Sequence, residues 1–534
     1  MMNWTQIYDP MNNIWFSAIV AVIPIVIFFL ALTVFKIKGH IAAFITVLSA
    51  ILVALIFYHM PLKLLIGATG YGFVYALWPI AYIVIGAVFL YKLSVKSGQF
   101  EIIRQSIVSL TDDQRLQMLL VAFAFNSFLE GAAGFGAPIA ITAALLVGLG
   151  FDPLKAAGLC LIANIAPGTV GAMGIPVIVA GQVTGIDPKE ISINLSNYLP
   201  IISFIMPFFL VVVMDSFKGL IKVWKPTFVA AIFYAISQWA TFRFIGPELP
   251  DIIAPIVCII ALAVYLKVFQ RKDAKQEKAG DGLTLGKIVK AWSPFIVLTI
   301  CVSIWCTSIF KNLFLPGGLL EKTTLNIPVP WLNNLVIKSA PLVPKPTPYA
   351  AMFKLDLISA TGTAILVSCI VSMILLKVSL RAGGEVLAET IKELYKPILT
   401  IMLVLAFAFV ANYSGESSTL GIALANTGHY FPIFAPVLGW LGVFLTGSVV
   451  SANALFGGLQ QITANQIHVA PLVLISANVA GGAMAKMISP QSIAVASGSV
   501  GLVGRESELF RFTVKYSLIF LVFVCIVSYV QSIL

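Results

Sequence analysis

Two stretches of this chain, far apart in the sequence, decide how it folds. Residues 161–180 read LIANIAPGTVGAMGIPVIVA, and residues 475–494 read ISANVAGGAMAKMISPQSIA. Aligned without gaps they share several small residues and two more telling pairs, Asn164 with Asn478 and Pro176 with Pro490. Upstream, residues 128–131 (FLEG) match residues 444–447 (FLTG) with a two-residue shift in spacing. Because alanine and glycine are abundant in both stretches, the paired Asn and Pro carry the argument for an internal repeat.

The composition places both stretches in a membrane. The chain has 534 residues, of which 60% are hydrophobic and 10% charged, and its mean hydropathy is +1.00. A soluble domain has roughly 25% charged residues. Apolar runs of about 20 residues recur along the chain, which predicts an all-α polytopic protein embedded in a lipid bilayer. The net charge of +11 fits basic cytoplasmic loops better than nucleic-acid binding.

Ten long apolar runs are clear, and four further segments are ambiguous. The clear runs are 15–35, 41–58, 64–91, 195–214, 227–245, 252–269, 291–310, 355–376, 396–412 and 512–534. The ambiguous segments are 116–149, 154–184, 432–467 and 469–500. As one helix, 116–149 would be about 50 Å long, which is too long for one crossing and short for two.

The positive-inside rule favours re-entrant hairpins at 116–149 and 432–467. With hairpins there and the N-terminus outside, the basic segment 271–290 falls inside and the Pro-rich loop 315–348 falls outside. If both segments crossed fully, 271–290 would lie outside. The sequence therefore predicts about 12 membrane-crossing helices plus two re-entrant hairpins, with both termini outside.

This topology divides the chain into two halves joined by a linker. Residues 1–269 form the first half, with hairpin 116–149 and a broken helix at 154–184. Residues 270–287 form a cytoplasmic linker. Residues 288–534 form the second half, with hairpin 432–467 and a broken helix at 469–500. The first hairpin enters from inside and the second from outside, an inverted repeat typical of secondary transporters.

Four glycine- and proline-rich breaks interrupt these segments, at 130–138 (EGAAGFGAP), 166–176 (APGTVGAMGIP), 447–453 (GSVVSAN) and 481–490 (GGAMAKMISP). Unwound chain survives in a bilayer only where it is buried or faces a watery cavity. Helix N-termini at such breaks offer N–H groups suited to a carboxylate. The backbone glycines expected at the breaks are Gly131, Gly134, Gly136, Gly168, Gly171, Gly447, Gly481 and Gly482. The alternative reading is close helix packing through small residues.

Two charged residues lie within the breaks, Glu130 in the first half and Lys486 in the second. An ionisable residue inside a membrane is a functional candidate by default. We expect Lys486 to receive an anionic substrate and Glu130 to carry a proton; alternatively, the two form a structural or gating ion pair. The polar residues expected to bind substrate are Asn164, Thr169, Ser451, Asn453, Asn478, Ser489 and Gln491. Glu416 is expected in a solvated loop at a membrane edge.

No pattern of an enzyme or a metal site accompanies these residues. The six cysteines are scattered through apolar runs without paired spacing, and neither HExxH nor GxSxG with a histidine partner is found. We therefore expect neither an enzyme, nor a disulfide, a metal or a cofactor.

The four broken stretches resemble the L-lactate permease family, which includes glycolate permeases. The matching segments are 126–141 (NSFLEGAAGFGAPIAI), 161–177 (LIANIAPGTVGAMGIPV), 446–460 (TGSVVSANALFGGLQ) and 477–496 (ANVAGGAMAKMISPQSIAVA). The resemblance extends over essentially the complete chain. It implies a proton-coupled symporter that imports L-lactate and related short 2-hydroxy monocarboxylates across the cytoplasmic (inner) membrane. Two alternatives remain, a Na⁺-coupled carboxylate symporter and a small-anion channel. The sequence leaves the oligomeric state open.

Overall fold

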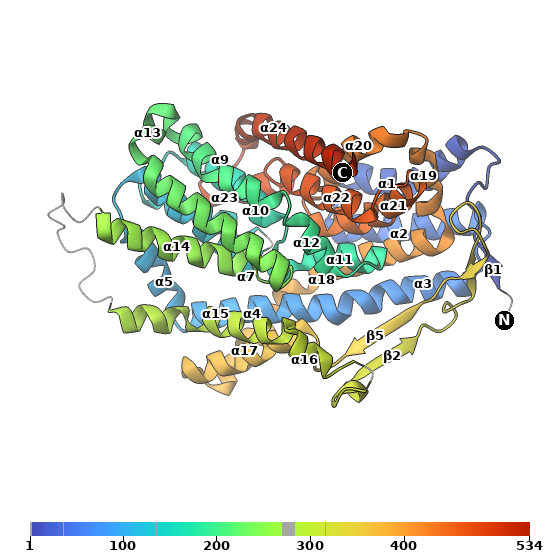
Figure 1. Cartoon of the computed structure of the whole chain (residues 1–534), viewed down its shortest axis with the longest axis horizontal. Coiled ribbons are helices and arrows are strands. Elements are labelled where there is room, and N and C mark those ends of the chain that lie inside the picture. Colours follow the sequence, from blue (N-terminus) through green and yellow to red (C-terminus); the bar gives the residue numbers. More distant parts are fainter. Residues whose placement is uncertain (1–2, 36, 135, 270–283, 316, 534) are drawn as a thin grey trace.

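The computed structural model describes residues 3–35, 37–134, 136–269, 284–315 and 317–533, apart from the side chains of Thr33 and Ser308. Figure 1 shows an elongated bundle whose long helices mostly run along its longest axis. Within the described residues, eleven helices are long and apolar enough to cross a membrane. The chain is thus a multi-pass, mainly helical membrane protein, while the predicted total of about 12 crossings stays a prediction.

The elements before residue 270 are α1 (Ile14–Thr33), α2 (Gly39–Ile56), α3 (Leu62–Tyr75), the π-helical segment η1 (Ala76–Ala81), α4 (Tyr82–Lys96), α5 (Gln99–Val108), α6 (Gln114–Met118), the π-helical segment η2 (Leu119–Phe125), α7 (Asn126–Ala132), α8 (Ala137–Gly148), α9 (Pro153–Ala163), α10 (Ile165–Gly168), the 3₁₀ turn η3 (Ala172–Gly174), α11 (Ile175–Thr184), α12 (Pro188–Leu195), α13 (Leu199–Phe244) and α14 (Pro250–Phe269), preceded by strand β1 (Trp4–Thr5).

The elements after residue 283 are α15 (Leu285–Cys306), α16 (Ser308–Asn312), η4 (Glu321–Thr323), β2 (Thr324–Pro328), β3 (Val336–Lys338), β4 (Thr347–Pro348), β5 (Met352–Asp356), α17 (Thr361–Leu375), α18 (Leu380–Ser414), α19 (Glu416–Ala425), η5 (Gly428–Tyr430), α20 (Phe431–Thr446), α21 (Val449–Gln466), α22 (Pro471–Lys486), α23 (Pro490–Ser499) and α24 (Glu506–Ile533).

The segment 116–149 folds into two antiparallel arms, α6–η2–α7 and α8. Midway along the arms, Thr142 Oγ1 donates a hydrogen bond to Asn126 Oδ1 at 3.3 Å. The far ends of the arms are also close together: a Cβ added at Gly150 would lie 3.9 Å from Gln114 Nε2. The segment therefore starts and ends at the same place, as a re-entrant hairpin must.

The segment 432–467 pairs in the same way. Gln460 Nε2 of α21 donates to the carbonyl oxygen of Ala435 in α20 at 3.1 Å. Nearer the turn, Gly442 packs so tightly on Ala452 that an added Cβ would lie 2.8 Å from the alanine methyl. The two arms are antiparallel, and the turn between them is at Gly447, whose φ of +71° favours glycine.

The two interrupted helices run in opposite directions through the bundle. In Figure 1, α9 lies nearer the end of the bundle where α14 ends and α15 begins, and α11 lies farther from that end. In the second interrupted helix the order is opposite: α22 lies farther from that end and α23 nearer to it. The first break follows α10, where the backbone of Gly171 (φ +60°) and Met173 (φ +49°) is not helical. The division into two halves stays a prediction, but this opposed arrangement is what an inverted repeat requires.

The interruption between α22 and α23 occupies only the end of the predicted stretch 481–490. Gly481 and Gly482 do not interrupt the helix, since α22 continues through them to Lys486. An added Cβ at Gly481 would lie 2.1 Å from the carbonyl oxygen of Pro436, so these glycines let α22 and α20 approach closely. Gly131 likewise lies inside α7. For these three glycines the small-residue packing alternative holds.

Helix α13 folds back on itself near residues 215–223, where Asp215, Ser216 and Val223 leave helical geometry. Its two arms are joined by Ser203 Oγ, which donates to Gln238 Oε1 at 2.7 Å. This one element therefore covers most of both the 195–214 and the 227–245 runs of the sequence.

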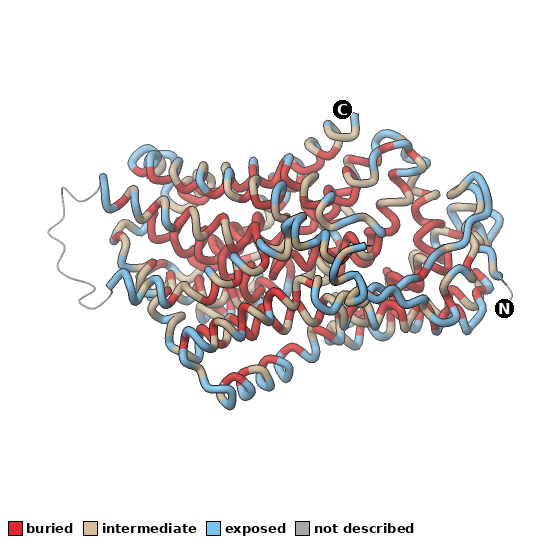
Figure 2. The backbone as a smooth tube through the Cα atoms, turned by 60° about the horizontal axis from the view of Figure 1, so that its bottom comes forward, coloured by how far each residue is buried: buried red, intermediate tan, exposed pale blue. Residues whose placement is uncertain are grey.

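The fold is not purely helical, because the Pro-rich loop 315–348 contains strands. β2 pairs antiparallel with β5, and β3 joins β1 in parallel and β4 antiparallel. The strands lie toward the end of the bundle that is opposite the C-terminus of α14 and the N-terminus of α15 (Figure 1). Most of the predicted linker, 270–283, lies outside the described residues, and α15 already begins at Leu285. Figure 2 shows buried residues concentrated along the middle of the bundle.

Candidate functional site

A cavity of about 120 Å³ lies where the breaks meet. Both hairpins and both interrupted helices contribute to its wall. It is lined by Glu130, Gly136, Gly168, Gly171, Ala172, Ile175, Pro176, Gly447, Ser448, Val449, Val450, Lys486, Gln491, Ser492 and Val495. We call it the central cavity.

Four helices begin at this cavity. They are α8 after Gly136, α11 at Ile175, α21 after Ser448 and α23, whose first turn brings Gln491 and Ser492 to the wall. The first N–H groups of a helix have no partner within the helix, and the N-terminal end of the helix dipole is positive. The cavity thus combines one cationic side chain with several helix starts, a setting that favours a carboxylate.

The two ionisable residues of the breaks form an ion pair. Lys486 Nζ donates to Glu130 Oε1, and the side chains are only 13% and 2% exposed. Asn164 Nδ2 donates to the other carboxylate oxygen, Oε2, at 3.1 Å. Glu130 is in the first hairpin and Lys486 at the end of α22, so the pair joins the two repeats. The ion-pair alternative is the arrangement that this structure contains.

Of the polar residues expected to bind substrate, only Gln491 lines the cavity, while Asn164 contacts its carboxylate. Asn453 Nδ2 donates to the carbonyl oxygen of Pro176 at 2.9 Å, and Asn478 Nδ2 donates to Asn453 Oδ1 at 3.0 Å. Gln460 extends this chain of amides by donating to Asn478 Oδ1 at 3.2 Å. These amides therefore link the first turn of α11 to the second hairpin and to α22.

The remaining expected binders make local contacts. Thr169 Oγ1 donates to the carbonyl oxygen of Ile165 at 3.2 Å. Ser489 caps α23 by accepting from the Ser492 amide at 3.2 Å. Ser451 is buried in the first turn of α21 and does not line the cavity. For Thr169 and Ser489 the sequence identified the break but not the side-chain role.

One buried acid, Asp251, was not identified from the sequence. Asp251, in the first turn of α14, is completely buried, and neither carboxylate oxygen has a hydrogen-bond partner within the described residues. It packs against the hairpin helix, since an added Cβ at Gly131 would lie 2.9 Å from Asp251 Cβ. Its place at the start of an apolar run resembles a membrane-edge residue, so the sequence offers little signal.

The expectation that Glu416 lies in a solvated loop is wrong. Glu416 is 1% exposed rather than solvated, because it starts α19 inside the bundle. Ser414 Oγ donates to Glu416 Oε1 at 3.1 Å. In the part of the chain that the structure describes, no group of three His, Cys, Asp or Glu side chains is placed to hold a metal.

Broken helices, paired hairpins and a buried charged cavity define a membrane transporter. Residues 17–534 match the sequence profile of the family described as L-lactate permease. The chain belongs to the L-lactate permease family, as the four resembling stretches predicted, and it is therefore a permease and not an enzyme.

Similar curated proteins cover nearly the complete chain. The glycolate permease GlcA of Escherichia coli K12 is 53% identical over 551 residues, covering 100% of this chain and 98% of that protein. An L-lactate permease of the same strain is 53% identical, with 99% and 98% covered. The L-lactate permease of Bacillus subtilis is 45% identical, with 99% and 98% covered.

Two solved transporters are more distantly similar. The YdaH transporter of Alcanivorax borkumensis has a TM-score of 0.46 at 13% identity, covering 88% of this chain and 87% of that one. MtrF of Neisseria gonorrhoeae has a TM-score of 0.48 at 14% identity, with 88% and 83% covered.

Proposed function

We propose that this chain imports L-lactate and related short 2-hydroxy monocarboxylates, such as glycolate, by proton symport across the cytoplasmic membrane. The names of its relatives, lactate and glycolate permeases, support the substrate class. The single observation that carries the proton coupling is the buried pair of Glu130 with Lys486 at the wall of the central cavity.

The pair couples proton and substrate through charge balance. While Glu130 is ionised it neutralises Lys486, and an added carboxylate would leave the buried site with one net negative charge. A charge at the bilayer centre costs at least about 2.5–3.5 kcal/mol on insertion scales. A proton on Glu130 removes that carboxylate's charge and frees Lys486 to pair with the substrate. The loaded site is then neutral again, so proton and anion cross together.

The helix starts supply the remaining contacts. A small hydroxy acid needs one cationic partner for its carboxylate and N–H or amide partners for its other oxygens. Lys486 provides the first. The unwound backbone beside α11 and α21, with Gln491, provides the second. We assign residues 1–269 and 288–534 as the two halves whose relative movement exposes the cavity to each side in turn.

Proteoliposome uptake of labelled L-lactate tests this function with Glu130→Gln, a permanently neutral replacement. Wild type should concentrate L-lactate when the outside is more acidic than the inside. E130Q should exchange internal for external lactate but fail to concentrate it in response to the proton gradient. Glu393→Gln is the matched control, because Glu393 forms an exposed ion pair with Lys92 and should leave accumulation intact.

The alternatives give different results in the same vesicles. Accumulation by E130Q equal to wild type would refute the carrier role of Glu130. Accumulation driven by a Na⁺ gradient at equal pH would instead establish Na⁺ symport. Lactate flux that never exceeds its own gradient would indicate a channel. Unlabelled glycolate as competitor ranks the two substrates.

A further inference from the structure

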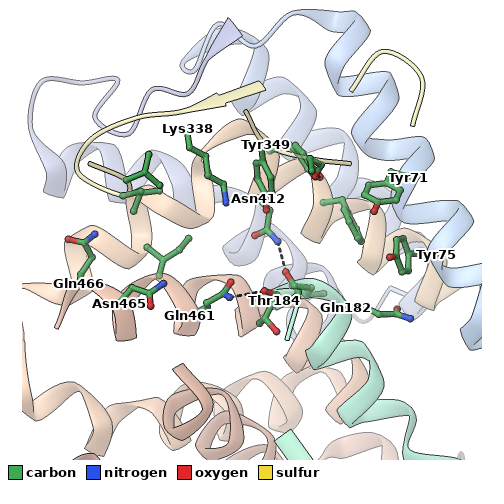
Figure 3. Close-up of a pocket in the computed structure, with 18 residues that line it drawn as sticks. Tyr71, Tyr75, Gln182, Thr184, Lys338, Tyr349, Asn412, Gln461, Asn465 and Gln466 are labelled. Carbon is green, nitrogen blue, oxygen red and sulfur yellow. Dashed lines mark hydrogen bonds between the residues drawn. The ribbon is translucent and has the colours of Figure 1, made fainter. Parts of the chain in front are cut away.

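A second polar cavity, of about 360 Å³, lies at the strand-bearing end of the bundle. It lies between the end of α11, the end of α18, the second half of α21 and the loop that carries β3. Figure 3 shows Lys338 and Tyr349 on one side of it and Gln461 and Asn465 on the other. We call it the Lys338 pocket. It shares no lining residue with the central cavity.

Lys338 is the only charged residue among those that line this pocket. Its ammonium nitrogen lies 3.6 Å from the ring centroid of Tyr349. No carboxylate of the described residues lies within salt-bridge distance of it. Burial lowers the pKa of Lys338 from its ordinary value, and an anion bound beside it would offset that penalty. A half-buried cation in a pocket without acids favours an anionic ligand.

The wall opposite Lys338 is formed by the C-terminal end of α11, and two side-chain amides cover its carbonyl oxygens. The C-terminal end of α11 carries a negative dipole and unpaired carbonyls. Asn412 Nδ2 covers the carbonyl oxygen of Val183 at 3.1 Å, and Gln461 Nε2 covers that of Thr184 at 2.7 Å. The Asn412 and Gln461 amides therefore occupy the carbonyl oxygens that would otherwise repel an anion at this wall.

Two helices connect the Lys338 pocket with the central cavity. α11 has Pro176 at the central cavity and Gln182 at the pocket, about 9 Å apart along a helix. α21 has Val450 at the central cavity and Gln461 at the pocket, about 16 Å apart. A ligand in the Lys338 pocket would therefore lie at the far ends of the helices that start at the transport site.

We propose that the Lys338 pocket is a second carboxylate site, which captures a short 2-hydroxy acid on the outer side before it reaches the central cavity. In this arrangement Lys338 pairs with the carboxylate. The identity of the ligand rests on the proposed function, whereas the anion site itself rests on the pocket.

Substrate protection of a pocket cysteine tests this site without requiring transport. Asn465 is exposed at the pocket, so Asn465→Cys should react with a membrane-impermeant maleimide added from outside. The parent chain, whose six cysteines are buried or half-buried, gives the background. L-lactate should slow the labelling relative to equal NaCl, and Lys338→Gln should raise the half-protecting concentration roughly tenfold or more, as expected for loss of a charge-assisted contact.

Three comparisons make the result specific. Lys338→Arg should restore protection, and Lys345→Gln, an exposed lysine of the same loop outside the pocket, should leave it unchanged. Lys486→Gln should also leave protection unchanged, because it removes the cation of the central cavity only.

The two proposals fail separately in this design. Equal half-protecting concentrations in K338Q and the N465C parent would overturn the second site, even if wild type concentrates lactate. Loss of protection in K486Q would show that occupancy of the central cavity causes the effect, and would also overturn it. Protection in a chain that transports no lactate would instead overturn the proposed function and leave the anion site standing.

Discussion

The buried pair of Glu130 and Lys486 should contribute far more to stability than the exposed pair of Lys92 and Glu393. The side chains of the first pair are 2% and 13% exposed, against 64% for Glu393 and 23% for Lys92. Removing one partner of a buried pair leaves an uncompensated charge and costs about 3–5 kcal/mol. An exposed pair contributes about 0–1 kcal/mol.

The structure ranks the single substitutions. Lys486→Gln leaves the carboxylate of Glu130 with only the Asn164 hydrogen bond, so we expect it to lower the free energy of unfolding by about 3 kcal/mol or more. Glu130→Gln should cost somewhat less, about 2–3 kcal/mol, because the long Lys486 side chain can reach into the polar cavity. The double variant leaves no charge at the position of this pair and should cost at least about 2 kcal/mol less than the sum of the two.

Unfolding in mixed micelles with increasing SDS, followed by tryptophan fluorescence, measures these differences. Glu393→Gln is the control and should change the free energy of unfolding by less than about 1 kcal/mol. Single substitutions that each cost no more than this control, and that add without coupling, would refute the assignment of a buried, mutually dependent pair.

Two further predictions concern the space beside Gly168 in the central cavity and the protonation of Glu248. Gly168→Ala should reduce lactate uptake about tenfold, a change of about 1.4 kcal/mol, because the new methyl would lie 2.8 Å from Lys486 Cδ. Gly148→Ala is the control, since there is open space around Gly148. Equal uptake by the two variants would contradict the prediction. Burial raises the pKa of Glu248, between α13 and α14, above its ordinary value of 4.5. Its protonated form therefore stabilises the fold below pH 4.5, and that contribution is lost as the pH rises through the raised pKa. Glu248→Gln should flatten this decline in a pH series of SDS unfolding curves, whereas the exposed Glu190→Gln should keep it; an unchanged slope in E248Q would argue against the buried carboxyl.

Local patterns predicted the ingredients of the central cavity well. The sequence located the hairpin 116–149, the broken segment around residues 166–176 and the two charged residues of the breaks, because hydropathy, glycine and proline act over a few neighbouring residues. Function followed from the same stretches, since they carry the family resemblance that the comparisons confirm.

Side-chain roles were harder to predict from the same information. Asn453 and Asn478 were expected to bind substrate, but they hydrogen-bond to each other and to Pro176. An asparagine beside a helix break looks the same in sequence whether it contacts a ligand or another segment. Which of the two it does depends on a partner far along the chain.

The sequence by itself determined that this protein is a membrane-embedded permease with interrupted helices, and it drew attention to Glu130 and Lys486 as the charged residues of the interrupted segments. These conclusions depend on composition and on spacing along the chain. Only the tertiary structure joined Glu130 to Lys486, buried Asp251 beside the first hairpin and placed Lys338 over a pocket at the far ends of α11 and α21. The physical reason is that each arrangement depends on contacts between segments distant in the sequence, which local hydropathy and turn preferences do not encode.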